Sequence, residues 1–346
     1  MDKSRQTSGL RIALIVFCVV LGLIFVTLTG VAIYATYMYN RMEYVGQETT
    51  ISPEEATNIK LQDATTINQG DTDWIDEDDI IVNDEQVFHD GQGDHILNIM
   101  LVGQDAREGE RVQRSDTMML VTFNLKTKTI TLTSLMRDQY VNIPGYGTTK
   151  LNHAYQYGGM SLMNETLYNH FGIEVDGNFE VDFTGFERII DKLGGVEIEL
   201  TKAEVDYLRE KGFKNFKVGK NILSGEPALW YARLRSIDDD YQRARRQRTV
   251  MMSLFEAYKE LSYTEMLSLL HDLLPLLRTN MTLSDITNYA MDLYPMFSGA
   301  KVETLRIPAD DTFKGGFVKV AEGLKLWCQY DIDFEANREL LNKVFE

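Results

Sequence analysis

The sequence predicts an α/β layered domain that follows a membrane anchor. Three features support this: a long uncharged run close to the N-terminus, a strongly acidic stretch after it, and short apolar strands that alternate with amphipathic helices from His95 onward. Alternating strands and helices are typical of domains in which helices cover a sheet. With 346 residues, of which 44% are hydrophobic, the chain can hold an anchor and one large domain or two small ones.

The uncharged run covers residues 12–33, and its 22 residues are enough to cross the hydrocarbon core of a bilayer. Residues 1–11 carry Lys3, Arg5 and Arg11 against one acidic residue, and an excess of basic residues marks the cytoplasmic side. A cleavable signal peptide is the alternative, but its apolar core is normally about 7–15 residues long. We therefore expect a short cytoplasmic tail, a single transmembrane helix, and an extracellular remainder.

Residues 34–94 are expected to be an extracellular linker with little secondary structure. Between Gly70 and Asp94 the chain holds ten Asp or Glu residues and no Lys or Arg. Such a run repels itself and stays extended in solution. We expect it to act as a spacer that holds the following domain away from the anionic membrane surface.

Residues 95–346 are expected to form one large domain, because no repeat and no second boundary interrupts them. Its predicted strands are short apolar or alternating segments, at 96–102, 118–123, 129–135, 196–200 and 302–307. Its predicted helices show helical periodicity or helix-ending signals, at 153–171, 186–193, 224–231, 283–297 and 334–344, and a further long helix begins near Asp240.

The charge and cysteine content exclude some classes of function. The formal net charge of −17 argues against a nucleic-acid partner, because that affinity rests on basic groups that meet phosphates. The two cysteines, Cys18 and Cys328, are far apart, with one in the apolar run, so no disulfide framework is expected. The sequence has no CxxC or HExxH motif and no His/Cys cluster, so a zinc site is not expected either.

Six arginines lie within one stretch of 19 residues, which is unusual in so acidic a chain. Arginine presents a rigid fork of donors that matches phosphate oxygens. Asp240, Arg243 and Gln247 are three and four residues apart, so on a helix they share one face. Arg233 and Arg235 share a face only if the chain is extended there, as we expect. Both sets could converge on one anion; the alternative is a solvated basic helix with local Asp–Arg pairs.

Two carboxylates lie next to predicted strands. Asp105 follows the first strand, and Asp116 precedes the second. Adjacent strands could bring them together at one edge of the sheet, where open α/β sheets bind ligands. Hard oxygen donors of this kind suit Mg²⁺, whose remaining positions are filled by water and phosphate. The alternative is that both are loop residues that cap helices or pair with Arg107 and Arg114.

Two cations extend this pattern. Arg137 ends the third predicted strand and shares the edge with Asp105 and Asp116 if the strands pair in sequence order. Lys150 precedes the first long helix, and lysine commonly binds phosphate as a point charge. The alternatives are a partner for Asp138 and an ordinary lysine at a helix start. Two acids for a metal and several fixed cations suit phosphoryl transfer, in which catalysis is mostly positioning and charge neutralisation.

The donor is not expected to be ATP, because the sequence has no Gly-rich P-loop and no kinase motif. Outside the cell, the available phosphate donor would be a lipid diphosphate. Its chain could lie in a groove between apolar helices, although such helices more often form an ordinary core.

The order and spacing of these motifs resemble the LytR–CpsA–Psr proteins of Gram-positive cell envelopes, from about His95 to the C-terminus. The resemblance rests on eight short segments, at 98–107, 114–117, 137–138, 150–155, 194–196, 232–235, 240–243 and 246–247. The chain departs from the family pattern at Met136, where many members have proline. The acidic run 238–240 leaves the register of the family's acid open, and Asp240 is chosen by its spacing to Arg243.

The resemblance implies a three-layer α/β/α sandwich around a central mixed sheet. It also implies Mg²⁺-assisted transfer, with Mn²⁺ as the alternative metal, of a phosphate-linked glycopolymer from a polyprenyl diphosphate carrier to peptidoglycan. The glycopolymer could be teichoic acid, capsule or another wall polysaccharide. A non-catalytic regulator that binds polyprenyl phosphate remains an alternative, as does a lipid pyrophosphatase that uses water as the acceptor.

Position by position, the resemblance assigns roles to ten residues. Asp105 and Asp116 correspond to the metal ligands. Asp240 would orient the arginines or accept the proton of the acceptor hydroxyl. Arg114 and Lys150 would assist in binding the diphosphate. The diphosphate clamp itself corresponds to Arg137, Arg233, Arg235, Arg243 and Gln247.

Overall fold

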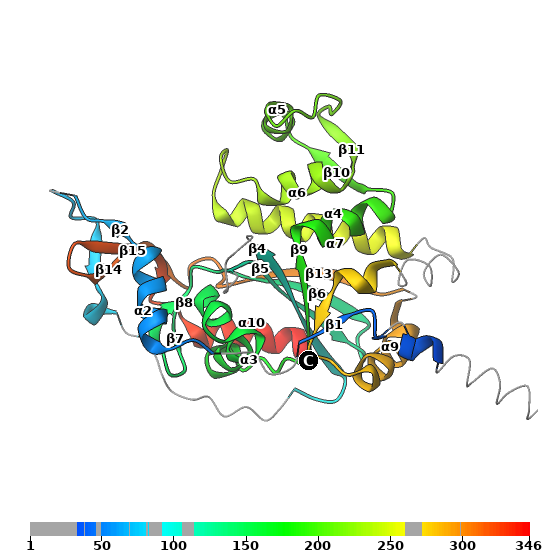
Figure 1. Ribbon diagram of the computed structural model, residues 1–346, viewed down its shortest axis with the longest axis horizontal. Helices are drawn as coiled ribbons and strands as arrows, with labels where there is room; N and C mark the ends of the chain where they lie inside the picture. Colours follow the sequence, from blue (N-terminus) through cyan, green and yellow to red (C-terminus); the bar gives the residue numbers. More distant parts are fainter. Residues whose placement is uncertain are drawn as a thin grey trace, which may run out of the picture.

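The structure is a computed structural model that describes residues 33–37, 39–45, 50–68, 70–80, 82, 92–105, 114–259, 272–297 and 299–346 (Figure 1). The predicted cytoplasmic tail and all but the last residue of the predicted transmembrane helix lie outside these ranges. Among the described residues, no helix combines the length and the apolar character needed to cross a membrane.

A seven-stranded mixed sheet forms the centre of the molecule, in the order β1-β12-β9-β4-β5-β6-β13. Its strands are β1 (Glu43–Tyr44), β4 (Ile96–Asp105), β5 (Arg114–Asn124), β6 (Thr129–Leu135), β9 (Gly177–Asp182), β12 (Arg278–Thr279) and β13 (Lys301–Ile307). β4, β5 and β6 are antiparallel neighbours, which confirms that the first three predicted strands pair in sequence order. β9 and β13 run parallel to β4 and β6, respectively.

Both faces of this sheet are buried, because successive side chains of a strand point to opposite faces. Met100 and Leu120, which are partners on β4 and β5, belong to one hydrophobic cluster. Ile99 and Met119 point the other way and belong to separate clusters. A sheet that is apolar on both faces needs helices on both sides.

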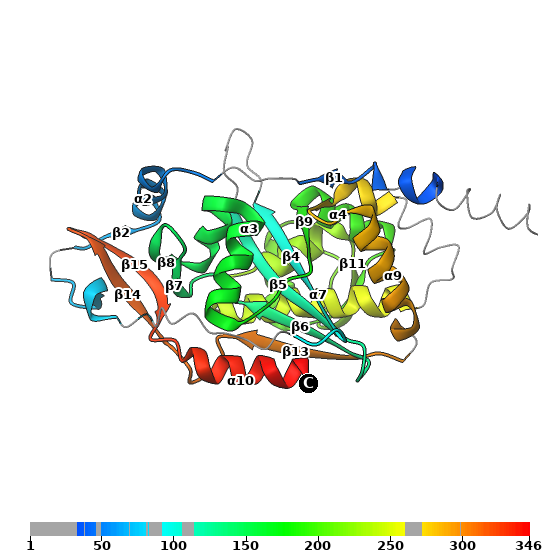
Figure 2. The same cartoon turned by 90° about the horizontal axis from the view of Figure 1, so that it is seen from below.

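Helices cover both faces, which gives the expected three layers (Figure 2). On one side, α3 and α10 pack against the cluster of Met100. On the other side, α7 and α9 pack against the cluster of Met119. These four helices are α3 (Leu151–Phe171), α7 (Asp240–Lys259), α9 (Leu283–Phe297) and α10 (Phe334–Phe345).

A smaller unit lies above the α7 side of the sheet in Figure 1. It consists of α4 (Phe183–Lys192), β10 (Val196–Leu200), α5 (Lys202–Glu210), β11 (Gly219–Leu223) and α6 (Gly225–Arg233). β10 and β11 form an antiparallel pair, and the unit shares its own hydrophobic cluster with α7. Its helix α5 begins with a capping box, in which Thr201 and Glu204 bond each other's backbone.

A second sheet lies at the end of the molecule opposite α9 (Figures 1 and 2). Its four strands have the order β2-β15-β14-β3. Next to it lie the β7–β8 hairpin, the helix α2 and the short helix η1. The bounds of these elements are β2 (Thr65–Thr66), β3 (Trp74–Asp76), β14 (Lys314–Ala321), β15 (Leu324–Tyr330), β7 (Tyr140–Ile143), β8 (Gly147–Lys150), α2 (Pro53–Gln62) and η1 (Glu77–Asp79).

The expectation that residues 34–94 form an extended spacer is wrong where the structure describes them. β1 is already a strand of the central sheet, parallel to β12. Farther along, Ser52 caps α2, and Ile51 and Ala56 are buried in the cluster that also holds Met100. The folded domain therefore includes much of the segment that was expected to separate it from the membrane.

Several of the described acidic residues of this segment are paired with lysines, which explains the difference. Lys325 of β15 forms ion pairs with Asp71 and Asp73, and its Nζ lies 3.0 Å from the Asp71 Oδ2. Within the segment, the Lys60 Nζ lies 2.9 Å from the Glu77 Oε1. The composition of the stretch predicted an extended spacer, because composition does not show that Lys325, about 250 residues away along the chain, pairs with these acidic residues.

Candidate functional site

The end of β4, the start of β5 and the end of β6 meet at one edge of the central sheet. The register pairs Asp105 with Arg114 and Gly103 with Thr117, and a bulge between these pairs accommodates Asp116 as an extra residue of β5. The backbone therefore brings Asp105 and Asp116 onto adjacent strands at this edge, as predicted. The side chains of Asp105, Arg114 and Asp116 lie outside the described part of the structure, so their assigned roles remain predictions.

Asp240, the first residue of α7, lies among three arginines from three different segments. Its Oδ2 is 2.5 Å from the Arg243 Nη2, and its Oδ1 is 3.5 Å from the Arg235 Nε. The Arg137 Nε, at the end of β6, lies 3.9 Å from the Asp240 Oδ2. The structure thus brings three of the predicted site arginines together around the carboxylate of a fourth predicted site residue.

The neighbouring aspartates have other partners. The Asp239 Oδ1 accepts a bond from the Gln242 backbone N–H at 2.9 Å, and Asp238 forms an ion pair with Arg246. The structure therefore resolves the register of the acidic run: Asp240 is the acid that lies among the clamp arginines.

Arg246 of α7 has a structural role. It is 3% exposed, and its Nε donates to the Glu204 Oε1 of α5 at 2.8 Å. Its Nη1 also donates to the Leu234 carbonyl at 3.0 Å. These contacts fix the loop between α6 and α7, and with it the position of Arg235.

Lys150 and Arg137 both contact the carboxylate of Asp138, which links Lys150 to the site. The Lys150 Nζ lies 2.7 Å from the Asp138 Oδ1, and the Arg137 Nε lies 3.3 Å from the Asp138 Oδ2. The backbone of this segment is also held, since the Asn152 N–H donates to the Arg137 carbonyl and the Gln329 N–H donates to the Asp138 carbonyl. The pairing of Arg137 with Asp138, weighed as an alternative to a site role, coexists with its position beside Asp240.

Arg233 differs in part from expectation. It was expected in an extended segment but is the last residue of α6, and the backbone leaves the helical conformation only at Leu234 (φ −59°, ψ 123°). Its guanidinium lies 4.1 Å from the centre of the Phe183 ring. Because the helix ends at this point, Arg233 and Arg235 still line the same cavity.

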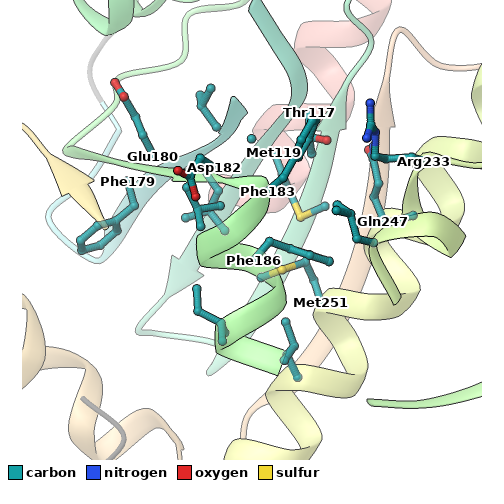
Figure 3. Close-up of a pocket in the computed structure, with 18 of the residues that line it drawn as sticks. Thr117, Met119, Phe179, Glu180, Asp182, Phe183, Phe186, Arg233, Gln247 and Met251 are labelled. Atoms are coloured by element: carbon teal, nitrogen blue, oxygen red, sulfur yellow. The ribbon is translucent and has the colours of Figure 1, made fainter. Parts of the chain in front are cut away.

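The cavity has a volume of about 510 Å³ and lies between the sheet and the helices α4, α6 and α7. One face of α7 lines it through four residues on successive turns, Arg243, Gln247, Met251 and Leu254. In Figure 3, Gln247 and Met251 project from α7 toward Phe186 of α4. Along α7, the charged and polar residues that line the cavity, Arg243 and Gln247, thus lie at the clamp end, and the apolar residues Met251 and Leu254 lie farther from the clamp.

Most of the remaining cavity wall is apolar. These residues come from β4, β5, α4, α6 and the segments beside them, and they include Leu101, Val102, Met119, Phe179, Phe186, Ile189, Leu229 and Leu277. A cavity of this size and polarity suits a ligand that is largely hydrocarbon. With cations beside it, the site suits an amphiphile that has an anionic head.

The contribution of β9 was not predicted. Glu180 and Asp182 of this strand line the cavity, and Glu180 is only 2% exposed. Glu180 accepts hydrogen bonds from Gln104 and, at 2.8 Å, from the Arg278 Nη1. Gln104 also bonds Tyr155, and burial is the main cause that raises the pKa of the Tyr155 hydroxyl. This network holds β9 and β12 to the end of β4, immediately before Asp105.

The alternation of residues 177–182 could have indicated a strand, but the strand lies between longer elements and its place beside β4 depends on parallel pairing. Its register places Glu180 opposite Val102 and Asp182 opposite Gln104. Sequence spacing does not reveal such pairing.

The sequence profile of the LytR–CpsA–Psr (LytR_cpsA_psr) family matches residues 56–327 of this chain. The chain belongs to this family. Two curated relatives each match more than 60% of this chain. The polyisoprenyl-teichoic acid–peptidoglycan teichoic acid transferase TagT of Bacillus subtilis is 37% identical over 228 residues, which are 63% of this chain and 70% of TagT. The corresponding transferase TagU of Enterococcus faecalis is 34% identical over 221 residues, which are 61% of this chain and 70% of TagU.

A solved LytR–CpsA–Psr structure has the same fold. It is the family protein YwtF (TagT) with bound octaprenyl pyrophosphate lipid, and it superposes with a TM-score of 0.55 at 28% sequence identity. The superposition covers 74% of this chain and 93% of that one. The octaprenyl pyrophosphate bound to that relative has the two parts that the cavity described here suits, an anionic head and a hydrocarbon chain.

Proposed function

We propose that this protein is a membrane-anchored extracellular phosphotransferase. It moves a phosphate-linked glycopolymer, such as teichoic acid, capsule or another wall polysaccharide, from a polyprenyl diphosphate carrier to peptidoglycan. The observation that carries the proposal is the convergence of Arg137, Arg235 and Arg243 around Asp240, beside a long apolar cavity. The relatives TagT and TagU, named as teichoic acid transferases, support the same reaction class.

In the proposed reaction, the cations hold the diphosphate. Five described cations are available for this, and they exceed the two carboxylates that pair with them, Asp138 and Asp240: Arg233, Arg235 and Arg243 line the cavity, and Arg137 and Lys150 lie beside these carboxylates. This excess of positive charge neutralises the phosphoryl oxygens as charge builds up on them. The polyprenyl chain occupies the apolar cavity, and so fixes the head group at its cationic end.

An acceptor hydroxyl on peptidoglycan attacks the sugar-side phosphorus. A new phosphorus–oxygen bond forms to the acceptor while the bond to the bridging oxygen breaks, and the carrier leaves as the lipid monophosphate. Asp240 accepts the hydroxyl proton or, as the alternative, serves only to orient the arginines. Gln247 and Arg114 assist in holding the donor.

Asp105 and Asp116 are the residues that would hold Mg²⁺, with Mn²⁺ as the alternative. Their backbone positions on adjacent strands, at a bulge on the edge where Arg137 lies, fit a site with two carboxylate ligands. When bound, the ion would neutralise charge on the diphosphate oxygens.

The test uses the purified full-length protein in detergent, with a polyprenyl diphosphate-linked glycopolymer as donor and glycan strands as acceptor. We expect Arg137→Ala to lower turnover by roughly 10²–10³-fold, as the loss of one charge-stabilising donor does. Arg209→Ala is the matched control, because Arg209 is an exposed residue of α5 that pairs with Asp206 away from the cavity. Wild-type turnover in Arg137→Ala would contradict the proposal.

The same assay separates the alternatives. A pyrophosphatase would release lipid monophosphate at the same rate whether or not the acceptor glycan is present. A non-catalytic regulator would bind the donor and release nothing. Deletion of the gene, followed by analysis of which wall polymer is shed into the medium, would identify the glycopolymer.

A further inference from the structure

The small sheet β2-β15-β14-β3 has one face that the proposed chemistry does not use. The register pairs Phe317 of β14 with both Trp74 of β3 and Trp327 of β15. Paired residues of adjacent strands point to the same face. Three aromatic side chains therefore form one row across three strands, over two strand spacings or roughly 10 Å.

The row is not part of the described core. The opposite face of the sheet is buried, with Val318, Leu326 and Cys328 in one hydrophobic cluster. None of the hydrophobic clusters among the described residues contains Trp74, Phe317 or Trp327. Trp327 is 37% exposed, which is high for a tryptophan in the middle of a strand.

The indole ring of Trp327 lies next to Gly315 on the neighbouring strand. A Cβ atom at Gly315, the residue diagonal to it on β14, would approach the Trp327 Cζ2 to 3.3 Å. The absence of a side chain at Gly315 therefore lets the indole lie close to the sheet. The rings of Phe317 and Trp74 are instead flanked by the ammonium groups of Lys325, at 4.4 Å, and Lys319, at 4.8 Å. Trp327 is thus the ring that is available for stacking.

The charges around the row have both signs. Lys319 lies 3.2 Å from Asp76, and Lys325 pairs with Asp71 and Asp73. The three carboxylates outnumber the two ammonium groups, so the local net charge is negative. An anionic membrane or a nucleic acid would therefore be repelled. Alternating donors and acceptors around an aromatic ring suit a neutral polyhydroxylated ligand, because a sugar presents apolar C–H groups on its faces and hydroxyls around its edge.

The row is connected to the clamp. Gln329 is two residues after Trp327 on the same face of β15, at a distance of roughly 7 Å along the strand. Its backbone N–H donates to the Asp138 carbonyl at 2.8 Å, and its side-chain amide donates to the Tyr241 hydroxyl at 3.1 Å. Tyr241 is adjacent to Asp240. Gln329 is itself fully buried, so these bonds fix the short distance between Trp327 and the clamp and are not part of the ligand surface.

We infer that this face of the small sheet, with Trp327 as the stacking residue, binds the acceptor glycan and directs it toward the clamp. The inference rests on the proposed function for the identity of the glycan as acceptor. Because Lys319 and Lys325 lie over the rings of Trp74 and Phe317, Trp327 is the single stacking position. This face adds a site for the acceptor to the cavity that takes the lipid of the donor.

The test measures binding of the full-length protein in detergent to peptidoglycan sacculi that have been stripped of wall polymer, with no donor present. We expect Trp327→Ala to weaken this binding at least about fivefold, because one stacking partner is lost. Trp327→Tyr should restore most of it. Tyr168→Ala is the matched control, since Tyr168 on α3 is also 37% exposed, and it should bind as the wild type does.

Two further measurements make the result decisive. Affinity for octaprenyl diphosphate and the melting temperature should be unchanged in Trp327→Ala, so that a loss of sacculus binding cannot come from the clamp or the fold. Unchanged sacculus binding in Trp327→Ala would overturn the inference. So would reduced binding to phosphatidylglycerol vesicles or reduced self-association in Trp327→Ala, because the face would then belong to a membrane or to a second copy of the chain. The assay needs no turnover, so its outcome is independent of whether the transferase proposal holds.

Discussion

Substitution of Asp240 can separate an effect on diphosphate binding from an effect on catalysis. Its carboxylate offsets part of the positive charge of Arg137, Arg235 and Arg243. A carboxylate in the middle of an anion site opposes the binding of the anion, so a purely binding role would not favour it. Its presence is explained if it orients the guanidiniums or accepts a proton during transfer.

We therefore predict that Asp240→Asn binds octaprenyl diphosphate about two- to fivefold more tightly, because one opposing charge is removed. Turnover should fall by about 10²-fold or more if the carboxylate takes the proton. Calorimetric titration and single-turnover kinetics measure the two effects. Asp239→Asn is the control, because Asp239 only accepts the Gln242 N–H at the start of α7 and asparagine serves that position equally well. Equal turnover in both variants would leave Asp240 with an orienting role at most.

Glu204 is a residue whose effect is on stability. It is 3% exposed and pairs with Arg246 at 2.8 Å. Burial acts to raise its pKa, but hydrogen bonds from Arg246 and Thr201 outweigh burial and lower the pKa below the ordinary value of 4.5. A carboxyl group with a lowered pKa in the folded state contributes stability that is complete above about pH 4.5 and is lost as the pH falls through the folded pKa.

Glu204→Gln should lower the free energy of unfolding by about 1.5–3 kcal/mol near neutral pH, because a buried hydrogen bond between charged groups is lost while Asp238 still pairs with Arg246. The difference between wild type and variant should shrink at about pH 4 and below, where the wild-type carboxyl also becomes protonated. Urea unfolding at several pH values measures this. Glu199→Gln, at an exposed position of β10, should cost little at any pH. A pH-independent difference would show that the ion pair is not its cause.

At the scale of elements, α7 determines the length of the cavity. Arg243 lies beside the clamp, and Leu254 lines the same cavity 11 residues later, roughly 16 Å farther along the helix. Met252 lies between them in sequence but points outward and is 40% exposed. Substitutions on the two sides of this helix can therefore separate an effect on the cavity from an effect on the helix itself.

Leu254→Trp should reduce affinity for octaprenyl diphosphate by about tenfold, because added volume in a packed cavity displaces its occupant. Geranyl diphosphate, whose chain is shorter, should bind almost normally, since it does not reach the deep end. Isothermal titration with both lipids provides the comparison, and Met252→Trp should alter neither. Equal losses for both lipids would mean that the chain does not follow α7.

Elements with strong local signals were predicted well. The strands at 129–135 and 196–200 and the helix at 283–297 have the predicted bounds. Elements that depend on distant partners were missed, among them β9, β14 and β15. β9 is held by parallel pairing with β4, and β14 and β15 pair with strands from the acidic N-terminal segment. A single sequence does not reveal these partners.

The site residues divide in the same way, into those with a local sequence pattern and those that depend on distant partners. The spacing of Asp240, Arg243 and Gln247 predicted a shared helix face, and the strand order placed Arg137 near them. The role of Glu180 could not be predicted, since its partners Gln104 and Arg278 are 76 and 98 residues away along the chain. Residues that act through a local pattern could be found from sequence, and residues that support them from other elements could not.

At the scale of the whole molecule, β1 connects the N-terminal segment to the domain. The Val45 N–H donates to the Thr279 carbonyl at 2.8 Å, and the Arg278 Nε lies 3.0 Å from the Glu43 Oε1. Arg278 also contacts Glu180 at 2.8 Å, so the segment is linked to the network that holds the end of β4.

A soluble variant that begins at Tyr39 should therefore melt about 2–4 °C above one that begins at residue 50, since β1 contributes on the order of 1 kcal/mol. Differential scanning calorimetry measures the shift. Glu43→Ala in the longer variant should cost less than the whole deletion, because it removes the ion pair and keeps the backbone bonds. Identical melting temperatures for the two lengths would contradict a structural contribution from β1.

The place of β1 also limits where in the envelope the enzyme can work. Glu43 enters the central sheet ten residues after Ile33, and ten residues of chain extend roughly 34 Å at most. If residues 12–33 cross the bilayer as predicted, this short connection keeps the domain close to the lipid surface. The sheet edge that carries the candidate site then lies no farther from the bilayer than the connection plus the width of the domain. If the proposed transfer takes place there, its acceptors would be glycan strands close to the bilayer, and glycan farther out in the envelope would be beyond reach.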